Sequence, residues 1–144
     1  MNHVGRVTIM QGIPGSGKST WIRENFPFYK TVCSADQYFI DSDGVYRFDQ
    51  NRLAEAHEAC FENFKAAITN RHPEIIIDNT NTSPREWSKY RVYAEEHDYW
   101  VGIKLILCDP EVAIARNVHD VPAATILKLH NRLMANLSKA TKEM

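Results

Sequence analysis

The chain alternates between short apolar runs and longer segments in which apolar residues recur every three or four positions. The runs predict buried strands, and the periodic segments predict amphipathic helices. Strands alternating with helices predict an α/β fold with a mainly parallel sheet. The predicted strands are 4–10, 30–34, 74–78 and 100–108. The predicted helices are 19–25, 50–70, 84–97, 110–117 and one from Pro122 to about 137, with a helical turn at 35–39.

Residues at the ends of these segments support the assignment. Asp49 is an N-cap candidate for the longest helix, and Ser83 followed by Pro84 is a typical helix start. Asp43-Gly44 predicts a tight turn, with 45–48 extended beyond it. The stripe of the longest helix that we expect to be buried is Leu53, Ala56, Cys60, Phe64, Ala67 and Ile68. Three consecutive isoleucines at 75–77 indicate a strand covered on both faces.

Composition narrows the class of protein. A chain of 144 residues without repeats or a linker-like segment predicts a single domain over 1–144. No apolar run is long enough for a membrane span, and the start does not have the pattern of a signal peptide. Cys33, Cys60 and Cys108 lie far apart, so we expect small apolar side chains in a reducing cytoplasm and neither disulfides nor a zinc site. The predicted localisation is cytoplasmic.

One motif predicts nucleotide binding. Residues 12–19, GIPGSGKS, match the G-x-x-x-x-G-K-[ST] pattern of a P-loop and lie between a predicted strand and a predicted helix. Backbone N–H groups of such a loop hold the α- and β-phosphates, and Lys18 reaches the β- and γ-phosphates as a catalytic residue. Ser19 is the expected Mg²⁺ ligand. The expected cofactors are ATP or another NTP and Mg²⁺, and the alternative is a glycine-rich turn with a chance lysine. The residues predicted to bind the nucleotide are Gly12, Pro14, Gly15, Ser16, Gly17, Lys18, Ser19 and Thr20.

Asp36 is the candidate general base. It follows the predicted strand 30–34, and the carboxyl ends of strands in an open α/β sheet face the ligand crevice. A carboxylate there can bind the acceptor hydroxyl and accept its proton. The alternative is an N-cap or a solvated turn residue.

A polar segment follows the isoleucine strand and opens at the same edge. Asp78 is a candidate Mg²⁺ ligand, and Asn79 and Thr80 are candidates for hydrogen bonds to the substrate. The alternative is a polar turn that caps the next helix.

Two arginines are further candidates. Arg116 lies in the predicted lid at 115–122, where it can stabilise charge on the transferred phosphoryl group; the alternative is a surface arginine at a helix end. His119 in the same segment is a candidate to assist Arg116, and the alternative is a structural histidine. Arg47, flanked by Tyr46 and Phe48, is a candidate for binding a single strand, and the alternative is a hairpin edge with packed aromatics. His57, which shares a helix face with Cys60, is expected in the core and not as a metal ligand.

In chain order these segments resemble the phage-type polynucleotide 5′-kinases. The resemblance implies a three-layer P-loop kinase fold with a short, mainly parallel sheet, flanking helices and a C-terminal lid. It implies that Asp36 is the general base and that the reaction moves the γ-phosphoryl of an NTP to the 5′-hydroxyl of a nucleic acid, in nucleic-acid end repair. The matching segments are 12–21 (GIPGSGKSTW), 34–38 (SADQY), 78–81 (DNTN) and 116–117 with Pro122.

The chain departs from that family at two places. Phe39 stands where phage members usually have an arginine that contacts the acceptor, and the lid is shorter. Segments 43–49 and 55–57 resemble a subgroup that lacks this arginine. The formal net charge of −1 also excludes wrapping of long nucleic acid, so a strand end bound by a local patch is expected.

Two other functions stay open. One is a kinase for a small metabolite, a nucleotide or a hydroxymethylated DNA base, which the near-neutral charge and Phe39 favour. The other is an NTP-binding module or slow ATPase within an assembly. The sequence leaves open whether RNA or DNA is the acceptor, which NTP is the donor, and whether the chain forms a homo-oligomer.

Overall fold

A computed structural model describes residues 3–117 and 121–142 of the chain. Strands and helices alternate, as the sequence predicts. The strands are β1 (Gly5–Gln11), β2 (Thr31–Cys33), β3 (Glu74–Ile77) and β4 (Tyr99–Leu105). The α-helices are α1 (Lys18–Asn25), α2 (Leu53–Thr69), α3 (Pro84–Glu96), α4 (Pro110–Ala115) and α5 (Ala123–Lys142). Two 3₁₀ turns, η1 (Ala35–Phe39) and η2 (Gln50–Arg52), lie before α2.

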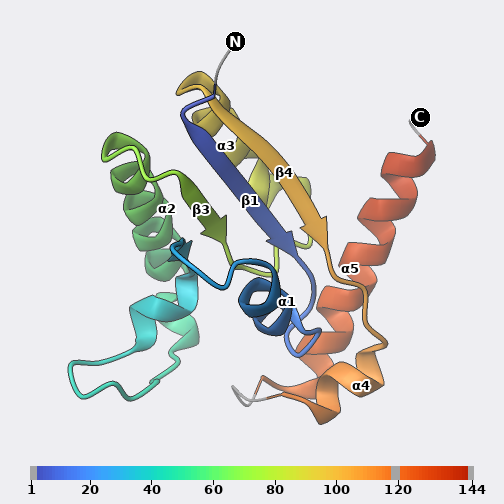
Figure 1. The fold of residues 1–144 in the computed structure, drawn as a ribbon. Coiled ribbons are helices and arrows are strands. Elements are labelled where there is room, and N and C mark those ends of the chain that lie inside the picture. The colour runs from blue at the N-terminus through green and yellow to red at the C-terminus, as the bar shows by residue number, and fades with distance from the viewer. Residues whose placement is uncertain (1–2, 118–120, 143–144) are drawn as a thin grey trace.

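The four strands form one sheet in the order β2-β3-β1-β4, and every pairing is parallel. Helix α1 lies in front of the sheet, α3 lies behind it, and α5 runs beside it on the β4 side (Figure 1). Side chains of β1 and β3 point alternately to the two faces: Ile75 and Ile77 pack with α2 and α3, whereas Ile76 packs with α1. The predicted three-layer arrangement is therefore confirmed.

The longest predicted helix is divided in two. The Asp49 carboxylate accepts a hydrogen bond from the Asn51 N–H at 3.0 Å, which starts η2, and α2 begins only at Leu53. Leu53 is 38% exposed, so the prediction that it is buried is wrong. It is the first residue of α2 and follows a 3₁₀ turn, whose different period breaks the stripe. The other five residues of the stripe are buried.

Several element ends also differ from the sequence prediction. Strand β4 ends at Leu105 and not at Cys108, because its register partner Gln11 is the last residue of β1. Helix α5 continues to Lys142. The segment 45–48 forms no strand and contributes only an isolated antiparallel bridge, Ile40 with Tyr46. Ser83 occupies the N-cap position of α3, but its side chain makes no capping hydrogen bond.

The cysteines behave as predicted: all three are free, and Cys33 and Cys60 are buried. Burial raises the pKa of the Cys33 thiol to about 12, so it stays protonated. Within the described ranges, no helix has both the length and the apolar character needed to cross a bilayer.

Candidate functional site

The loops that follow β1, β2 and β3 meet at the carboxyl edge of the sheet. The Gly12 N–H donates to the Thr80 carbonyl at 3.0 Å, and the Asp78 N–H donates to the Cys33 carbonyl at 2.9 Å. The buried Asn81 amide donates to the Met10 carbonyl at 2.7 Å. These bonds bring the glycine-rich loop and the segments containing Asp36 and Asp78 to one place, as expected for parallel strands.

The glycine-rich loop has a backbone that only glycine allows at several positions. Gly15 and Gly17 have φ values of 81° and 105°, in the left-handed region. A Cβ on Gly15 would lie 2.3 Å from the Ala113 carbonyl oxygen, so α4 packs directly on the loop. A Cβ on Gly12 would lie 2.8 Å from Ser16 Oγ. The loop therefore forms a compact turn that leads into α1 at Lys18.

Lys18 lies at the centre of the loop and is partly buried. Its Nζ donates to the carbonyl oxygens of Gly12 at 2.7 Å and Ile13 at 3.1 Å. Burial lowers the pKa of this ammonium, and the negative charges of Asp78 and Asp36 act in the opposite direction. Asp78 and Asp36, which come from two different loops, therefore both lie close enough to act on the Lys18 ammonium.

The loop residues fit the phosphates of a nucleotide. Ser16 Oγ is buried and has no hydrogen-bond partner in the described residues, which makes it available to a phosphate oxygen. Ser19 and Thr20 are exposed in the first turn of α1, where N–H groups and the helix dipole favour an anion. Ser19 and Asp78 would be the protein's ligands to Mg²⁺, which usually takes its remaining ligands from phosphates and water.

Asp36 lies on a turn whose backbone is fixed by two hydrogen bonds to side chains. The Asp36 N–H donates to Ser34 Oγ at 3.1 Å, and the preceding Ala35 N–H donates to Asn79 Oδ1 at 2.8 Å. The Asp36 residue is exposed. A fixed backbone with an accessible carboxylate suits a group that must meet an acceptor hydroxyl.

Tyr46 contacts the Asp36 side chain, and sequence reasoning missed this role. Its hydroxyl donates to Asp36 Oδ1 at 3.3 Å. Burial, together with the charge of Asp36, raises the pKa of the Tyr46 phenol to about 12, so the phenol is a constant donor at neutral pH. The bond joins residues ten positions apart in the chain, and the only sequence signal was an aromatic residue beside Arg47.

The polar segment after β3 has a structural role. Asn79 is 9% exposed, and both ends of its amide are engaged: Oδ1 with the Ala35 N–H and Nδ2 with the Cys60 sulfur at 3.5 Å. Its side chain thus ties two loops together, and the hydrogen bond of Asn79 to a substrate stays a prediction. The Thr80 carbonyl accepts a hydrogen bond from the Gly12 N–H. The side chain of Thr80 remains a candidate for a substrate contact.

Arg47 lies beside the site in the loop between η1 and η2. Its Nε is 2.6 Å from Asp41 Oδ2, and the side chain remains 71% exposed. The rings of Tyr46 and Phe48 pack on the ring of Phe39, with centroid distances of 6.3 and 5.1 Å. The packed aromatics of the alternative interpretation are therefore present. Substrate binding by Arg47 stays a prediction.

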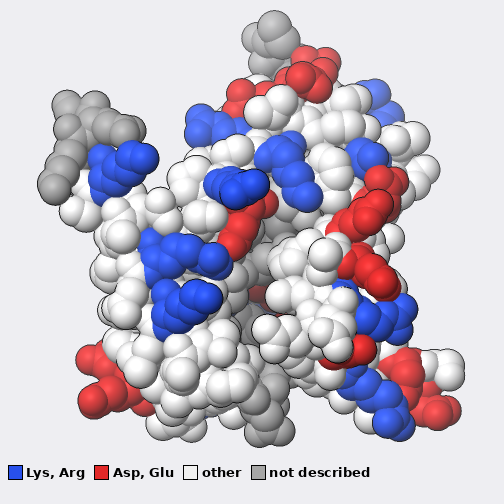
Figure 2. Space-filling view, turned by 180° about the vertical axis from the view of Figure 1, so that it is seen from behind, with Lys and Arg blue, Asp and Glu red and all other residues white. Residues whose placement is uncertain are grey.

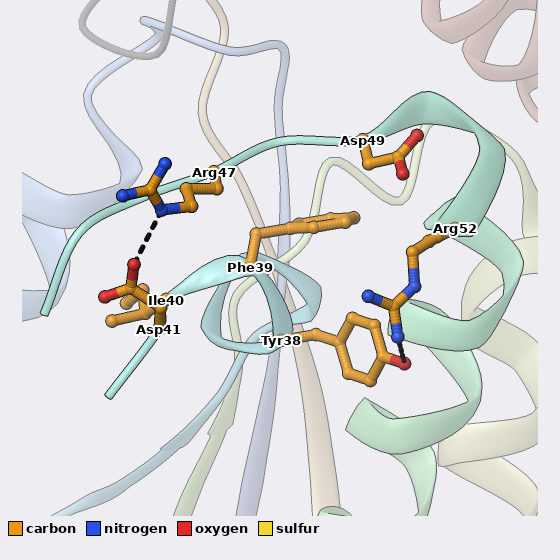
Figure 3. Close-up of a pocket in the computed structure, with 7 residues that line it drawn as sticks. All are labelled: Tyr38, Phe39, Ile40, Asp41, Arg47, Asp49 and Arg52. Atoms are coloured by element: carbon orange, nitrogen blue, oxygen red, sulfur yellow. Dashed lines mark hydrogen bonds and ion pairs between the residues drawn. The ribbon is translucent and has the colours of Figure 1, made fainter. Parts of the chain in front are cut away.

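A surface pocket of about 270 Å³ adjoins this loop. In Figure 3, Arg47 points to Asp41 on one side of Phe39, and Arg52 points to the Tyr38 hydroxyl on the other. Arg52 Nη2 donates to that hydroxyl at 2.8 Å. The residues that line the pocket are Tyr38, Phe39, Ile40, Asp41, Arg47, Asp49 and Arg52.

Arg116 is the C-cap residue of α4, the helix that packs on the loop at Gly15. Its backbone N–H donates to the Val112 and Ala113 carbonyls, and the residue is exposed. A catalytic role for its side chain stays a prediction, and His119 lies outside the described residues. His57 is half-buried, and this burial lowers the pKa of its imidazole.

Comparisons with known proteins agree with this geometry. A family model described as an AAA domain matches residues 7–123. Human NEDD4-binding protein 2 is 35% identical over 141 residues, which is 89% of this chain but only 8% of that protein. The chain thus spans a small part of this curated relative.

Solved structures share the fold. A chain of the Pnkp1/Rnl/Hen1 RNA repair complex superposes with a TM-score of 0.77 at 22% identity, over 96% of this chain and 47% of that one. A gluconokinase from Sinorhizobium meliloti 1021 superposes with a TM-score of 0.56 at 12% identity, over 92% and 77%. The fold is that of P-loop kinases, and the resemblance to polynucleotide-kinase-type P-loop domains is confirmed. Because the family model covers well over half of its residues, this chain belongs to the AAA domain family.

Proposed function

We propose that this chain is an ATP- or NTP-dependent polynucleotide 5′-hydroxyl kinase, with residues 1–144 forming one kinase domain. The observation that carries the proposal is the convergence of three charged groups from three strand ends: Lys18 from the P-loop, Asp36 after β2 and Asp78 after β3. In this proposal Lys18 binds the γ-phosphoryl group, Asp36 binds the acceptor hydroxyl, and Asp78 binds a cation. A P-loop that only binds nucleotide does not need an accessible carboxylate with its own hydrogen-bond donor.

In the proposed reaction, Asp36 orients the acceptor hydroxyl and accepts its proton. The acceptor oxygen forms a bond to the γ-phosphorus, and the bond from that phosphorus to the β–γ bridging oxygen breaks, which leaves an NDP. The positive charges of Lys18 and Arg116 stabilise the negative charge on the transferred group. Mg²⁺, when bound by Ser19 and Asp78, would supply further neutralising charge on the phosphate oxygens.

Two sets of observations bear on the nature of the acceptor. The four motifs in chain order and the fold shared with a member of an RNA repair complex favour a nucleic-acid 5′ end. The formal net charge of −1, Phe39 and the fold shared with a gluconokinase favour the second candidate, a kinase for a small molecule.

Label transfer from γ-labelled ATP tests the proposal directly. In the presence of Mg²⁺, we expect label on a 5′-hydroxyl oligonucleotide and none on the same oligonucleotide carrying a 5′-phosphate. Gluconate and a free nucleoside serve as small acceptors. Label on a small acceptor alone, with no label on the oligonucleotide, would replace the proposal with the second candidate.

Tyr46→Phe is expected to lower kcat for transfer by about threefold to tenfold, the effect of losing one hydrogen bond of about 1 kcal/mol. Without the phenol donor, the Asp36 carboxylate loses a hydrogen bond that helps to fix its orientation. Initial rates of label transfer at saturating ATP and acceptor measure the change in kcat.

Tyr38→Phe is the matched control. The Tyr38 hydroxyl donates to Glu55 at 2.6 Å and accepts from Arg52, so its removal leaves Asp36 untouched. Equal kcat values for the Tyr46→Phe and Tyr38→Phe variants would contradict a role for the Tyr46 hydroxyl in transfer.

A further inference from the structure

Helix α5 is hydrogen-bonded to the loop that contains Asp78. Arg132 Nε donates to Thr82 Oγ1 at 2.8 Å, and its Nη2 lies 2.6 Å from Glu86 Oε1 at the start of α3. Asn136 Nδ2 donates to the Thr82 carbonyl at 3.0 Å. The start of α3 and the middle of α5 therefore lie close together beside the loop that follows β3.

The outer faces of α3 and α5 carry a concentration of positive charge, which we call the α3–α5 basic face. Figure 2 shows Lys and Arg side chains gathered over this side of the molecule, next to the hollow in the middle of the view. Glu86 lies among them and is paired with Arg132, and the other acidic residues of α3, Glu95 and Glu96, lie at its far end. Since the whole chain has a formal charge of −1, the remainder carries an acidic excess. The basic residues of the face are Arg85, Lys89, Lys128, Arg132 and Lys139.

Helical spacing aligns these residues. Arg85 and Lys89 lie four positions apart on α3, and Lys128 and Arg132 lie four apart on α5, so each pair shares a helix face. At 1.5 Å per residue, Lys128 and Lys139 are about 16 Å apart along α5. Such a row matches a short length of a single strand.

The charges are available to an external ligand. Arg85 and Lys128 are exposed, and neither side chain makes a hydrogen bond or ion pair to the described part of the chain. Lys89 Nζ lies 4.8 Å above the Phe61 ring, an arrangement that leaves its outer side open. Protein interfaces usually have an apolar core, whereas the large exposed apolar residues on the described parts of α3 and α5 are only Val92 and Leu127.

We infer that the α3–α5 basic face binds the phosphodiester backbone of a single-stranded nucleic acid whose 5′ end lies at Asp36. The inference rests on the proposed function and extends it: the strand continues from the site along this face. Backbone contacts of this kind are independent of base sequence and lose affinity as salt is added.

The double variant Arg85→Glu/Lys128→Glu tests the inference by binding. With a fluorescent 5′-hydroxyl single strand of about 20 nucleotides, we expect a dissociation constant at least about tenfold higher at low salt. The slope of log Kd against the logarithm of the salt concentration should fall by about 1.4, because each phosphate contact with a single strand contributes about 0.7 to this slope. Transfer to a 5′-hydroxyl dinucleotide, which is too short to reach the face, should stay at the wild-type rate.

Arg23→Glu/Arg71→Glu is the matched control. It makes the same change in net charge at two exposed positions away from the face, in α1 and in the turn between α2 and β3. Equal Kd values and equal salt slopes for the two double variants, or no strand binding by the wild type, would overturn the inference. Salt-dependent strand binding without any phosphoryl transfer would instead overturn the proposed function and leave the inference standing.

Discussion

Lys18→Ala is expected to lower phosphoryl transfer by roughly 10³-fold, because one positive charge aimed at the transferred group is worth this much in comparable sites. The structure holds this ammonium inside the P-loop, within reach of both Asp36 and Asp78. Alanine removes the charge and leaves the glycine backbone unchanged. Initial rates of label transfer at saturating ATP and acceptor measure the effect.

Lys30→Ala provides the control for a lost lysine. Lys30 Nζ also donates to a backbone carbonyl, that of Phe26 at 2.9 Å, but it lies beyond α1 and away from the site. Its variant should retain wild-type transfer, and thermal melting should show both variants folded. Activity of Lys18→Ala within a few-fold of wild type would remove the P-loop as the active site.

Asp36→Asn is expected to lower transfer by roughly 10² to 10⁴-fold while nucleotide binding is retained, since general-base catalysis contributes on this scale. Asparagine has the same shape and can still accept from Tyr46, but it cannot take the proton of the acceptor hydroxyl. The Ser34 and Asn79 bonds that shape the turn involve the backbone N–H groups of Asp36 and Ala35, so the turn should persist. Calorimetric titration with ATP, beside the transfer assay, separates the two effects.

Asp43→Asn removes the same charge from the neighbouring loop and should leave transfer unchanged. Asp43 is exposed and belongs to the tight turn at Gly44. If both aspartate variants lose activity equally, the loss follows from net charge and not from a base at Asp36. If Asp36→Asn transfers at the wild-type rate, another group must accept the proton.

The sequence predicted the fold well because its signals are local. Strand and helix periods, the P-loop and helix starts such as Pro84 are all encoded within a few neighbouring residues. The placement of Lys18, Asp36 and Asp78 at one edge followed from topology alone, since each residue comes soon after a parallel strand. The end of β4 could not be predicted, because it depends on where β1 ends at Gln11.

The side-chain contacts of the site were harder to predict. Tyr46 reaches Asp36 across an irregular loop that has no period, so the pattern could not specify the contact. Asn79 illustrates another limit. A polar residue after a strand gives the same pattern whether it faces a ligand or, as here, the backbone of the adjacent loop.

The loop between η1 and η2 is closed mainly by its own contacts. The Ile40–Tyr46 bridge and the Asp41–Arg47 ion pair close it, and Tyr46 and Phe48 rest on Phe39. None of these contacts involves the P-loop. For protein engineering, residues 40–49 are therefore a cassette that can be exchanged as a unit, if Tyr46, which contacts Asp36, and Asp49, which caps η2, are kept. Under the proposed function, libraries built in this cassette are expected to alter acceptor choice while the P-loop stays as it is.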